Sequence, residues 1–167
     1  PGFSGTDAFT YTADDSNGGT ATATVSITVA AAKAKAVADF DGDADTDISV
    51  FRPSSGAWFI QGRATTYHGR DGDAAVPADY DGDGDADIAV FRPASGGWHI
   101  AGQPAVFFGR NGDVPVPGHY AGAAGAEIAV FRPANGGWYR PGQATVFFGR
   151  SGDAPLPLPH AIGQAIG

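Results

Sequence analysis

Three observations predict an all-β protein built from repeated units. The tripeptide Phe-Arg-Pro recurs every 40 residues, beginning at Phe51, Phe91 and Phe131, and the surrounding unit recurs with it without a gap. Glycine (26) and proline (12) are frequent among the 167 residues, which disfavours long helices and favours short strands joined by tight turns. Each unit also contains short β-branched and aromatic runs, which are typical of strands. Repeats of this length indicate blade-like units that cannot bury their apolar faces alone.

The repeats define most of the domain organisation. The repeat domain spans residues 39–158, in the copies 39–78, 79–118 and 119–158. Residues 1–30 differ, because 7–13 and 21–30 alternate with period two around an Asp/Ser/Asn/Gly turn, which predicts an N-terminal β-hairpin. Residues 31–38 are interpreted as a linker and 159–167 as a C-terminal tail. A lone hairpin is marginal in water, so we expect the repeat domain, an upstream domain or another subunit to cover it.

Each copy is expected to hold several short strands. The first strand ends at the proline of Phe-Arg-Pro, and a glycine three residues later makes a turn with positive φ. The expected strands are 48–52, 88–92 and 128–132, then runs that begin at 58, 98 and 138, and then 65–67, 105–108 and 145–148. The proline-spaced segments 76–77 and 114–117 are expected as edge strands or extended loops, because proline cannot donate to a ladder.

Two acidic loops carry the clearest chemistry. Ten of the 18 acidic residues lie in residues 39–47 and 79–87. In each loop carboxylates stand at positions 1, 3, 5 and 9, glycine stands at position 4, and position 7 can supply a carbonyl oxygen. Calcium takes six to eight hard oxygen ligands, whereas without a cation such charges repel by up to about 4 kcal/mol per pair. The predicted ligands are Asp39, Asp41, Asp43, Asp45 and Asp47, and Asp79, Asp81, Asp83, Asp85 and Asp87.

The third copy departs from this pattern. Its aligned positions are His119, Ala121, Ala123 and Glu127, and one carboxylate is too few for calcium. The sequence therefore predicts two Ca²⁺ ions and a third repeat that keeps the turn without a metal. We interpret His119 as a structural or exposed residue.

For the other recurring residues, a structural role is the first interpretation. Trp58, Trp98 and Trp138 occur once per copy and are expected in the core, with a row of sugar-stacking rings as the alternative. Recurring arginines at 52, 92 and 132, and at 70, 110 and 150, accompany aspartates at 73, 113 and 153. They are expected as ion pairs between repeats or as caps on backbone carbonyls. No nucleophile–base set, P-loop or zinc-protease motif is present, so we expect no enzyme activity.

Composition and charge exclude some classes of binding partner and site. The net charge of −8 is local, because outside the two loops 8 acidic residues face 10 Lys and Arg. No basic stripe is available for phosphates, so nucleic acid is not an expected partner. The absence of cysteine excludes disulfides and thiolate metal sites. No apolar run approaches the roughly 20 residues of a membrane-spanning helix, and the start at Pro1 is typical of a processed or truncated end.

The repeat unit, with stretches such as DFDGDADTDISVFRP and FFGRNGDVPVP, resembles bacterial VCBS/FG-GAP repeats, which are related to the integrin α-chain blade. The resemblance covers about residues 36–158 and implies calcium in each conserved loop. It implicates eight carboxylates and the carbonyls of Asp45 and Asp85; the carboxylates are Asp39, Asp41, Asp43, Asp47, Asp79, Asp81, Asp83 and Asp87. Residues 2–29 resemble the C-terminal strands of cadherin-like or Ig-like adhesin domains. Both resemblances imply secreted or surface proteins of bacteria.

These observations favour a calcium-stabilised extracellular structural or adhesive protein. The alternatives are a glycan-binding module that uses the tryptophans, and an accessory fragment of a larger secreted enzyme. Three copies are fewer than the four to eight blades of closed propellers. The repeats therefore indicate a propeller fragment, a compact pseudo-threefold domain, or a subunit that forms filaments through its N-terminal strands. Expected partners are copies of the chain itself, other surface or matrix proteins, and glycans.

Overall fold

The computed structural model describes residues 5–29 and 36–156, and the chain divides into two compact units, Pro1–Ala34 and Lys35–Gly167. The described residues form β-strands, turns and one short 3₁₀ helix, η1 (Pro53–Ser55), without an α-helix. The predicted all-β fold is therefore confirmed. Most of the predicted linker 31–38 and the whole tail 159–167 lie outside the described residues.

The first unit is the predicted hairpin. Strand β1 (Gly5–Asp14) pairs antiparallel with β2 (Thr20–Val29), and Phe9 stands opposite Val25. The Asp15 carboxylate shapes the turn by accepting hydrogen bonds from the backbone N–H groups of Asn17 and Gly19, both at 2.8 Å. Because side chains alternate between the faces of a strand, the apolar residues share one face of the hairpin. They are Phe9, Tyr11, Val25 and Ile27, and all four are exposed.

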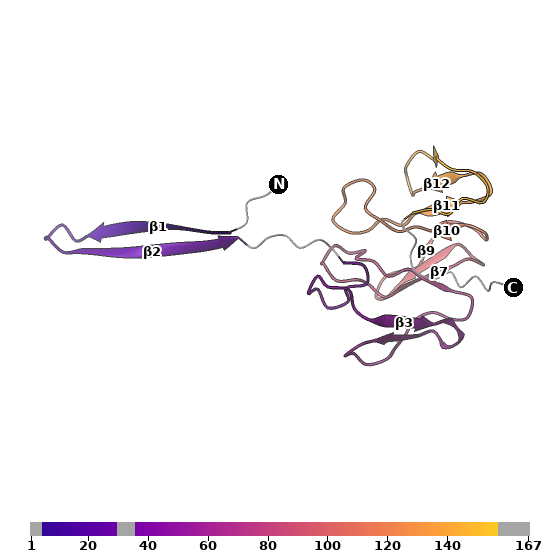
Figure 1. Ribbon diagram of the computed structural model, residues 1–167, viewed down its shortest axis with the longest axis horizontal. Coiled ribbons are helices and arrows are strands. Elements are labelled where there is room, and N and C mark those ends of the chain that lie inside the picture. The colour runs from indigo at the N-terminus through magenta and orange to yellow at the C-terminus, as the bar shows by residue number, and fades with distance from the viewer. Residues whose placement is uncertain (1–4, 30–35, 157–167) are drawn as a thin grey trace. The chain divides into compact units, whose positions relative to one another are not determined.

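The second unit contains one antiparallel sheet for each repeat. The first sheet has β3 (Ser49–Arg52), β4 (Ala57–Ile60) and β5 (Thr66–Tyr67). The second has β6 (Ala74–Ala75), β7 (Ala89–Arg92), β8 (Gly97–Ile100) and β9 (Val106–Phe107). The third has β10 (Val114–Pro115), β11 (Val130–Arg132), β12 (Gly137–Tyr139) and β13 (Val146–Phe147). In the described residues the sheets follow one another in chain order and form no closed barrel (Figure 1).

Each of the first two repeats contributes a strand to the sheet of the next repeat. Strand β6 lies near the end of the first repeat but pairs with β7 of the second, and β10 of the second repeat pairs with β11 of the third in the same way. The Val76 N–H donates to the Ala89 carbonyl at 2.9 Å, and Val116 repeats this bond to Ala129 at 2.8 Å. These segments were expected near 76–77 and 114–117. They do lie at sheet edges, although the first strand begins two residues earlier than expected.

Glycine makes the turn after the first strand of each repeat. Gly56, Gly96 and Gly136 all have φ = 66°, in the left-handed region that glycine enters without steric cost. At each of the three, a Cβ atom would also collide with the carbonyl of a later glycine, such as Gly69 against Gly56. The predicted positive φ is confirmed, and close backbone approach gives a second reason for glycine there.

Aromatic pairs fill the core of each repeat. Phe91 and Trp98 are fully buried, with ring centroids 5.1 Å apart, and Phe131 and Trp138 repeat the pair at 5.2 Å. The indole N–H of Trp98 donates to the Phe108 carbonyl at 2.9 Å, so burial leaves no unpaired donor on the ring. Trp58 is 2% exposed, and its indole N–H reaches the His68 carbonyl at 2.8 Å. The burial of these tryptophans supports the role in the core that was predicted for them.

Candidate metal-binding loops

A buried carboxylate organises the first acidic loop. Asp39 is 3% exposed; its Oδ1 accepts from the Gly42 N–H and its Oδ2 from the Ala44 N–H, each at 2.8 Å. The loop closes where the Asp47 N–H donates to the Ala38 carbonyl at 3.0 Å and the Asp47 carboxylate accepts from the Phe40 N–H at 2.7 Å. The chain therefore turns tightly around the first carboxylate.

The second loop has the same frame. Asp79 is 8% exposed and accepts from the N–H groups of Gly82 (2.6 Å) and Gly84 (3.2 Å). The Asp87 carboxylate accepts from the Tyr80 N–H at 2.8 Å, and its own N–H donates to the Ala78 carbonyl at 2.8 Å. Repetition of these bonds shows that the loop geometry belongs to the repeat.

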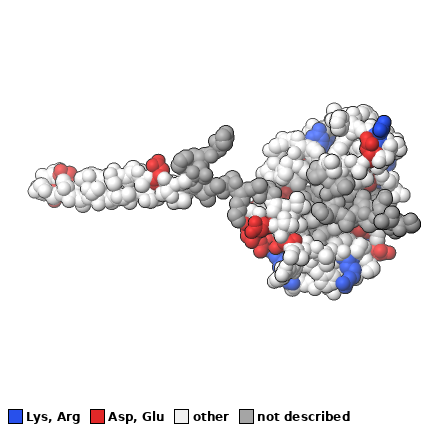
Figure 2. Space-filling view, in the orientation of Figure 1, with Lys and Arg blue, Asp and Glu red and all other residues white. Residues whose placement is uncertain are grey.

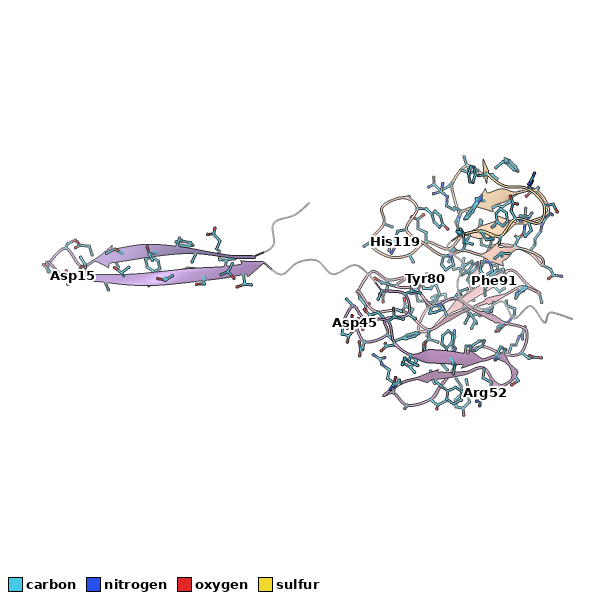
Figure 3. The ribbon with its side chains drawn as sticks, in the orientation of Figure 1. Asp15, Asp45, Arg52, Tyr80, Phe91 and His119 are labelled. Atoms are coloured by element: carbon cyan, nitrogen blue, oxygen red, sulfur yellow. The ribbon has the colours of Figure 1, made fainter. Side chains whose placement is uncertain are left out.

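Three carboxylates converge in each of these loops. One oxygen from each member of the group lies within 4.8 Å of the others. The groups are Asp39, Asp41 and Asp43, and Asp79, Asp81 and Asp87. Figure 2 shows carboxylates gathered at one side of the repeat unit, where Figure 3 places Asp45 of the first loop and Tyr80 of the second. Hard oxygen atoms this close together can hold a metal ion.

The other predicted ligands stand outside these groups. In the first loop Asp47 bonds the backbone of Phe40, and in the second Asp83 accepts from the Asp85 N–H at 2.9 Å. The Asp45 N–H likewise donates to Asp43 at 2.8 Å. The expected roles for the carbonyls of Asp45 and Asp85 stay predictions.

Like charges act on one another across the two loops. Burial raises the pKa of Asp85, and the charges of Asp83 and Asp39 add to this effect. Burial also raises the pKa of Asp87, although the Tyr80 N–H works in the opposite direction. Both shifts mean that the surroundings disfavour the ionised forms of these two carboxyl groups of the second loop.

The loops of successive repeats touch. The Ala86 N–H donates to the Asp39 carbonyl at 2.5 Å, and the Ala126 N–H donates to the Asp79 carbonyl at 2.6 Å. Gly42, with φ = 74°, lies against the Asp85 carboxylate, where a Cβ would collide. Each acidic loop is therefore part of a junction between repeats as well as a turn within one.

The third loop keeps the turn with different side chains. The N–H groups of Tyr120 (3.3 Å) and Ala121 (2.7 Å) donate to the Glu127 carboxylate, and Gly118 pairs with Glu127 as Ala78 does with Asp87. His119 is exposed. Among the described residues no group of three ligating side chains forms in this loop.

One contact at the first loop was not predicted from the sequence. The Arg63 guanidinium donates to the Phe40 carbonyl, and its positive charge acts to lower the pKa of Asp85. The equivalent positions hold Gln103 and Gln143. Because Arg63 does not recur, the repeat pattern contained no signal for it.

The tryptophans do not form an exposed row. Trp58 and Trp98 are at most 2% exposed, and only Trp138 among the three is partly exposed. Two histidines lie close together: His68 Nε2 is 2.9 Å from the His99 carbonyl oxygen, and His99 Nε2 is 2.9 Å from Arg92 Nη1.

Comparison with known proteins identifies one segment. Residues 1–28 match the bacterial Ig domain family. No curated protein and no solved structure matches the chain. The match covers the hairpin and indicates an extracellular, adhesin-type β protein of bacteria. The resemblance of the repeats to VCBS and FG-GAP units stays a prediction. Among the described residues, no helix has the length and apolar character needed to cross a membrane.

Proposed function

We propose that this chain is a non-catalytic, extracellular structural or adhesive module whose repeats are stabilised by two calcium ions. The observation that carries the proposal is that a group of three converging carboxylates recurs in the equivalent loops of the first two repeats. The same backbone hydrogen bonds to the first carboxylate hold both loops. The bacterial Ig match supports the extracellular location.

The donor set favours calcium over other metals. Every clustered ligand is a carboxylate oxygen, which suits hard cations, and magnesium usually keeps several waters instead of taking many protein ligands. The residues proposed to hold the ions are Asp39, Asp41, Asp43 and Asp47, and Asp79, Asp81, Asp83 and Asp87. The carbonyls of Asp45 and Asp85 complete the proposed donor sets.

The proposed role of the metal is to stiffen the junctions between repeats. A cation would offset the repulsion between carboxylates, which adds to burial in raising the pKa values of Asp85 and Asp87. The first loop contacts the second through Asp39 and Ala86, and the second contacts the third through Asp79 and Ala126. An ion in either loop would therefore hold two neighbouring repeats, which suits a protein that bears load or presents a surface.

The hairpin provides a second candidate role in assembly. Its apolar face exposes Phe9 (56%), Tyr11 (54%) and Ile27 (52%), and in an Ig-type sandwich such a face packs inside. We propose this face as a contact for a neighbouring chain, through which the N-terminal strands would form filaments. Substitution of Phe9 by Lys should then reduce the size of the assemblies without changing the repeats, whereas an unchanged size distribution would contradict this role.

Two alternatives receive less support. Burial of Trp58 and Trp98 leaves little aromatic surface for sugar stacking. An accessory role beside a secreted enzyme is compatible with the same extracellular module, but no described feature favours it.

Equilibrium dialysis followed by elemental analysis tests the metal assignment. We expect two calcium ions per wild-type chain in the presence of excess magnesium. One ion should remain in Asp41→Asn and in Asp81→Asn, and none in the double variant. Asn135→Asp, an exposed carboxylate outside the loops, is the control and should leave the number at two. Absence of bound calcium at millimolar concentration in folded wild-type protein would sink the assignment.

A further inference from the structure

The three sheets of the repeat unit differ in one respect. The second and third sheets have four strands each, because β6 and β10 add to β7 and β11. The first sheet has three, in the order β3-β4-β5. Among the described residues, β3 therefore has no strand on the side that β6 and β10 occupy in the other sheets.

A segment with the properties of the added strand lies near the end of the third repeat. Residues 153–156 read Asp-Ala-Pro-Leu, where residues 73–76 read Asp-Ala-Ala-Val and residues 113–116 read Asp-Val-Pro-Val. Residues 113–116 and 153–156 have proline at the same position, Pro115 and Pro155. Because Pro115 pairs with Val130 in β10, a proline at this position is compatible with the paired strand. Within the described part of the chain, residues 153–156 pair with no strand.

Apolar residues at the two free ends are exposed where their counterparts are buried. Val50 on β3 is 60% exposed, whereas Val90 and Val130 are fully buried against the preceding repeats. Leu156 is 77% exposed, whereas the equivalent Val76 and Val116 are fully buried. Each end thus presents surface that a repeat junction covers elsewhere in the same molecule.

The charges at the two ends are complementary. At the first junction Arg92 Nε lies 2.9 Å from Asp73 Oδ1, and at the second Arg132 Nε lies 2.7 Å from Asp113 Oδ1. Both aspartate side chains are 1% exposed. The equivalent Arg52 is exposed and lies over the Phe59 ring, 4.5 Å from its centroid, as Arg132 lies over Tyr139. The equivalent Asp153 is 48% exposed, 3.9 Å from Arg150.

We propose that residues 153–156 of one copy add to the free edge of β3 in a second copy, head to tail. Pairing in the register of β6 with β7 places Ala154 opposite Phe51 and Pro155 opposite Val50. Asp153 then meets Arg52, and Val50 packs on the third repeat of the other copy, where Trp138 is partly exposed. The contact reproduces a junction that the chain forms twice within itself.

This association is distinct from the hairpin contact and does not depend on calcium. The two contacting surfaces are different, so the contact is heterologous, and it closes a ring or extends a filament according to the rotation between copies. The strand added at an open sheet edge supplies backbone hydrogen bonds, and the side chains set the register.

Sedimentation velocity of the full 167-residue chain over a range of concentrations tests the proposal. Because the hairpin face is a separate proposed contact, the comparison is made in a Phe9→Lys background. In that background we expect species larger than the monomer, and monomers once Val50→Lys or Leu156→Lys is added. Both positions are exposed in the single chain, so the variants should fold; circular dichroism checks this. Tyr67→Lys, at the opposite edge of the first sheet and 73% exposed, is the control and should still assemble in the same background.

Mixing the two variants gives the sharpest outcome. Val50→Lys keeps the donor segment and Leu156→Lys keeps the free edge, so an equimolar mixture should form a complex of two chains and stop there. A Phe9→Lys chain that is monomeric at all concentrations, or assembly that survives both substitutions, would overturn the proposal. Assembly lost in the Tyr67 control would assign it to another apolar surface and also overturn it.

The absence of cysteine permits a direct test of register. The proposed pairing places Leu156 opposite Ser49, and directly paired residues lie within the Cα separation that a disulfide spans. Oxidised Ser49→Cys/Leu156→Cys protein should therefore give covalently closed rings or a ladder of multimers on a non-reducing gel. Each single variant should give at most dimers. A double variant that is folded but remains monomeric after oxidation would contradict the register.

Discussion

The second and third loops of the repeat domain share a backbone but differ in chemistry. In both, a tyrosine hydroxyl donates to a preceding valine carbonyl, Tyr80 to Val76 at 2.7 Å and Tyr120 to Val116 at 2.6 Å. In both, the carboxylate at position 9 accepts from that tyrosine's N–H. The second loop adds clustered carboxylates, whereas the third has alanine at positions 3 and 5.

This difference separates two tasks that the acidic residues perform. Position 9 and the tyrosine maintain the turn, because they are bonded alike in the second loop and in the third, although Asp87 at position 9 also belongs to the carboxylate group of the second loop. Positions 3 and 5 are exposed in the second loop, and the third loop keeps the turn with alanine there, so the proposed role of these two carboxylates is to bind the metal. The metal, in this account, strengthens a loop that the repeat already forms.

The largest effect should come from converting the third loop into the second. His119→Asp, Ala121→Asp and Ala123→Asp together should create a third site, and dialysis should then find three ions per chain. At calcium 100 times above its Kd, the new site would stabilise the protein by about 2.7 kcal/mol. In chelator the same variant should be less stable than wild type, because the added charges repel.

The control for this conversion carries asparagine at the same three positions. It should bind two ions, as the wild type does, since it adds oxygens without charge. A folded triple-aspartate protein that binds only two ions would show that aspartates at these three positions are not enough to make the third loop bind calcium.

Removal of the first carboxylate should have the next largest effect. Asp79→Ala leaves the N–H groups of Gly82 and Gly84 without their acceptor, and a lost partner costs about 1–3 kcal/mol. His119→Ala at the equivalent exposed position should change the free energy of unfolding by less than about 0.5 kcal/mol. Urea denaturation in chelator measures both. Equal effects would mean that Asp79 does not organise its loop.

The tyrosine hydroxyls should give the smallest effect. Tyr80→Phe and Tyr120→Phe each remove one hydrogen bond to a valine carbonyl, which is worth about 0.5–1.5 kcal/mol. In chelator the two losses should be similar, because the frames are alike. A large loss in only one variant, measured by denaturation, would show that the two frames are not equivalent.

Features marked by a repeat or by a regular alternation of residues were predicted from the sequence, whereas a contact made by one unrepeated residue was not. Period-two alternation located the hairpin, and the 40-residue interval located the glycine turns and the acidic loops. The recurring Arg and Asp residues were expected as inter-repeat ion pairs or carbonyl caps, and Arg92–Asp73 and Arg132–Asp113 form the former. Arg63 was missed because it occurs in a single copy.

Pattern also could not decide which carboxylates converge. Asp87 clusters with Asp79 and Asp81, whereas the equivalent Asp47 lies outside the group of the first loop. Each accepts from the backbone N–H of the second residue of its own loop, Asp87 from Tyr80 at 2.8 Å and Asp47 from Phe40 at 2.7 Å. The difference lies in side-chain placement within a crowded set of like charges, which sequence spacing does not specify.

Thermal unfolding with calcium and with chelator tests the central claim most directly. Two sites that each contribute up to about 2.7 kcal/mol at 100 times Kd should raise the melting temperature by about 5–20 °C in a domain of this size. The rise should fall by roughly half in Asp81→Asn and vanish in Asp41→Asn/Asp81→Asn. An equal melting temperature for the folded wild type in calcium and in chelator would contradict the account.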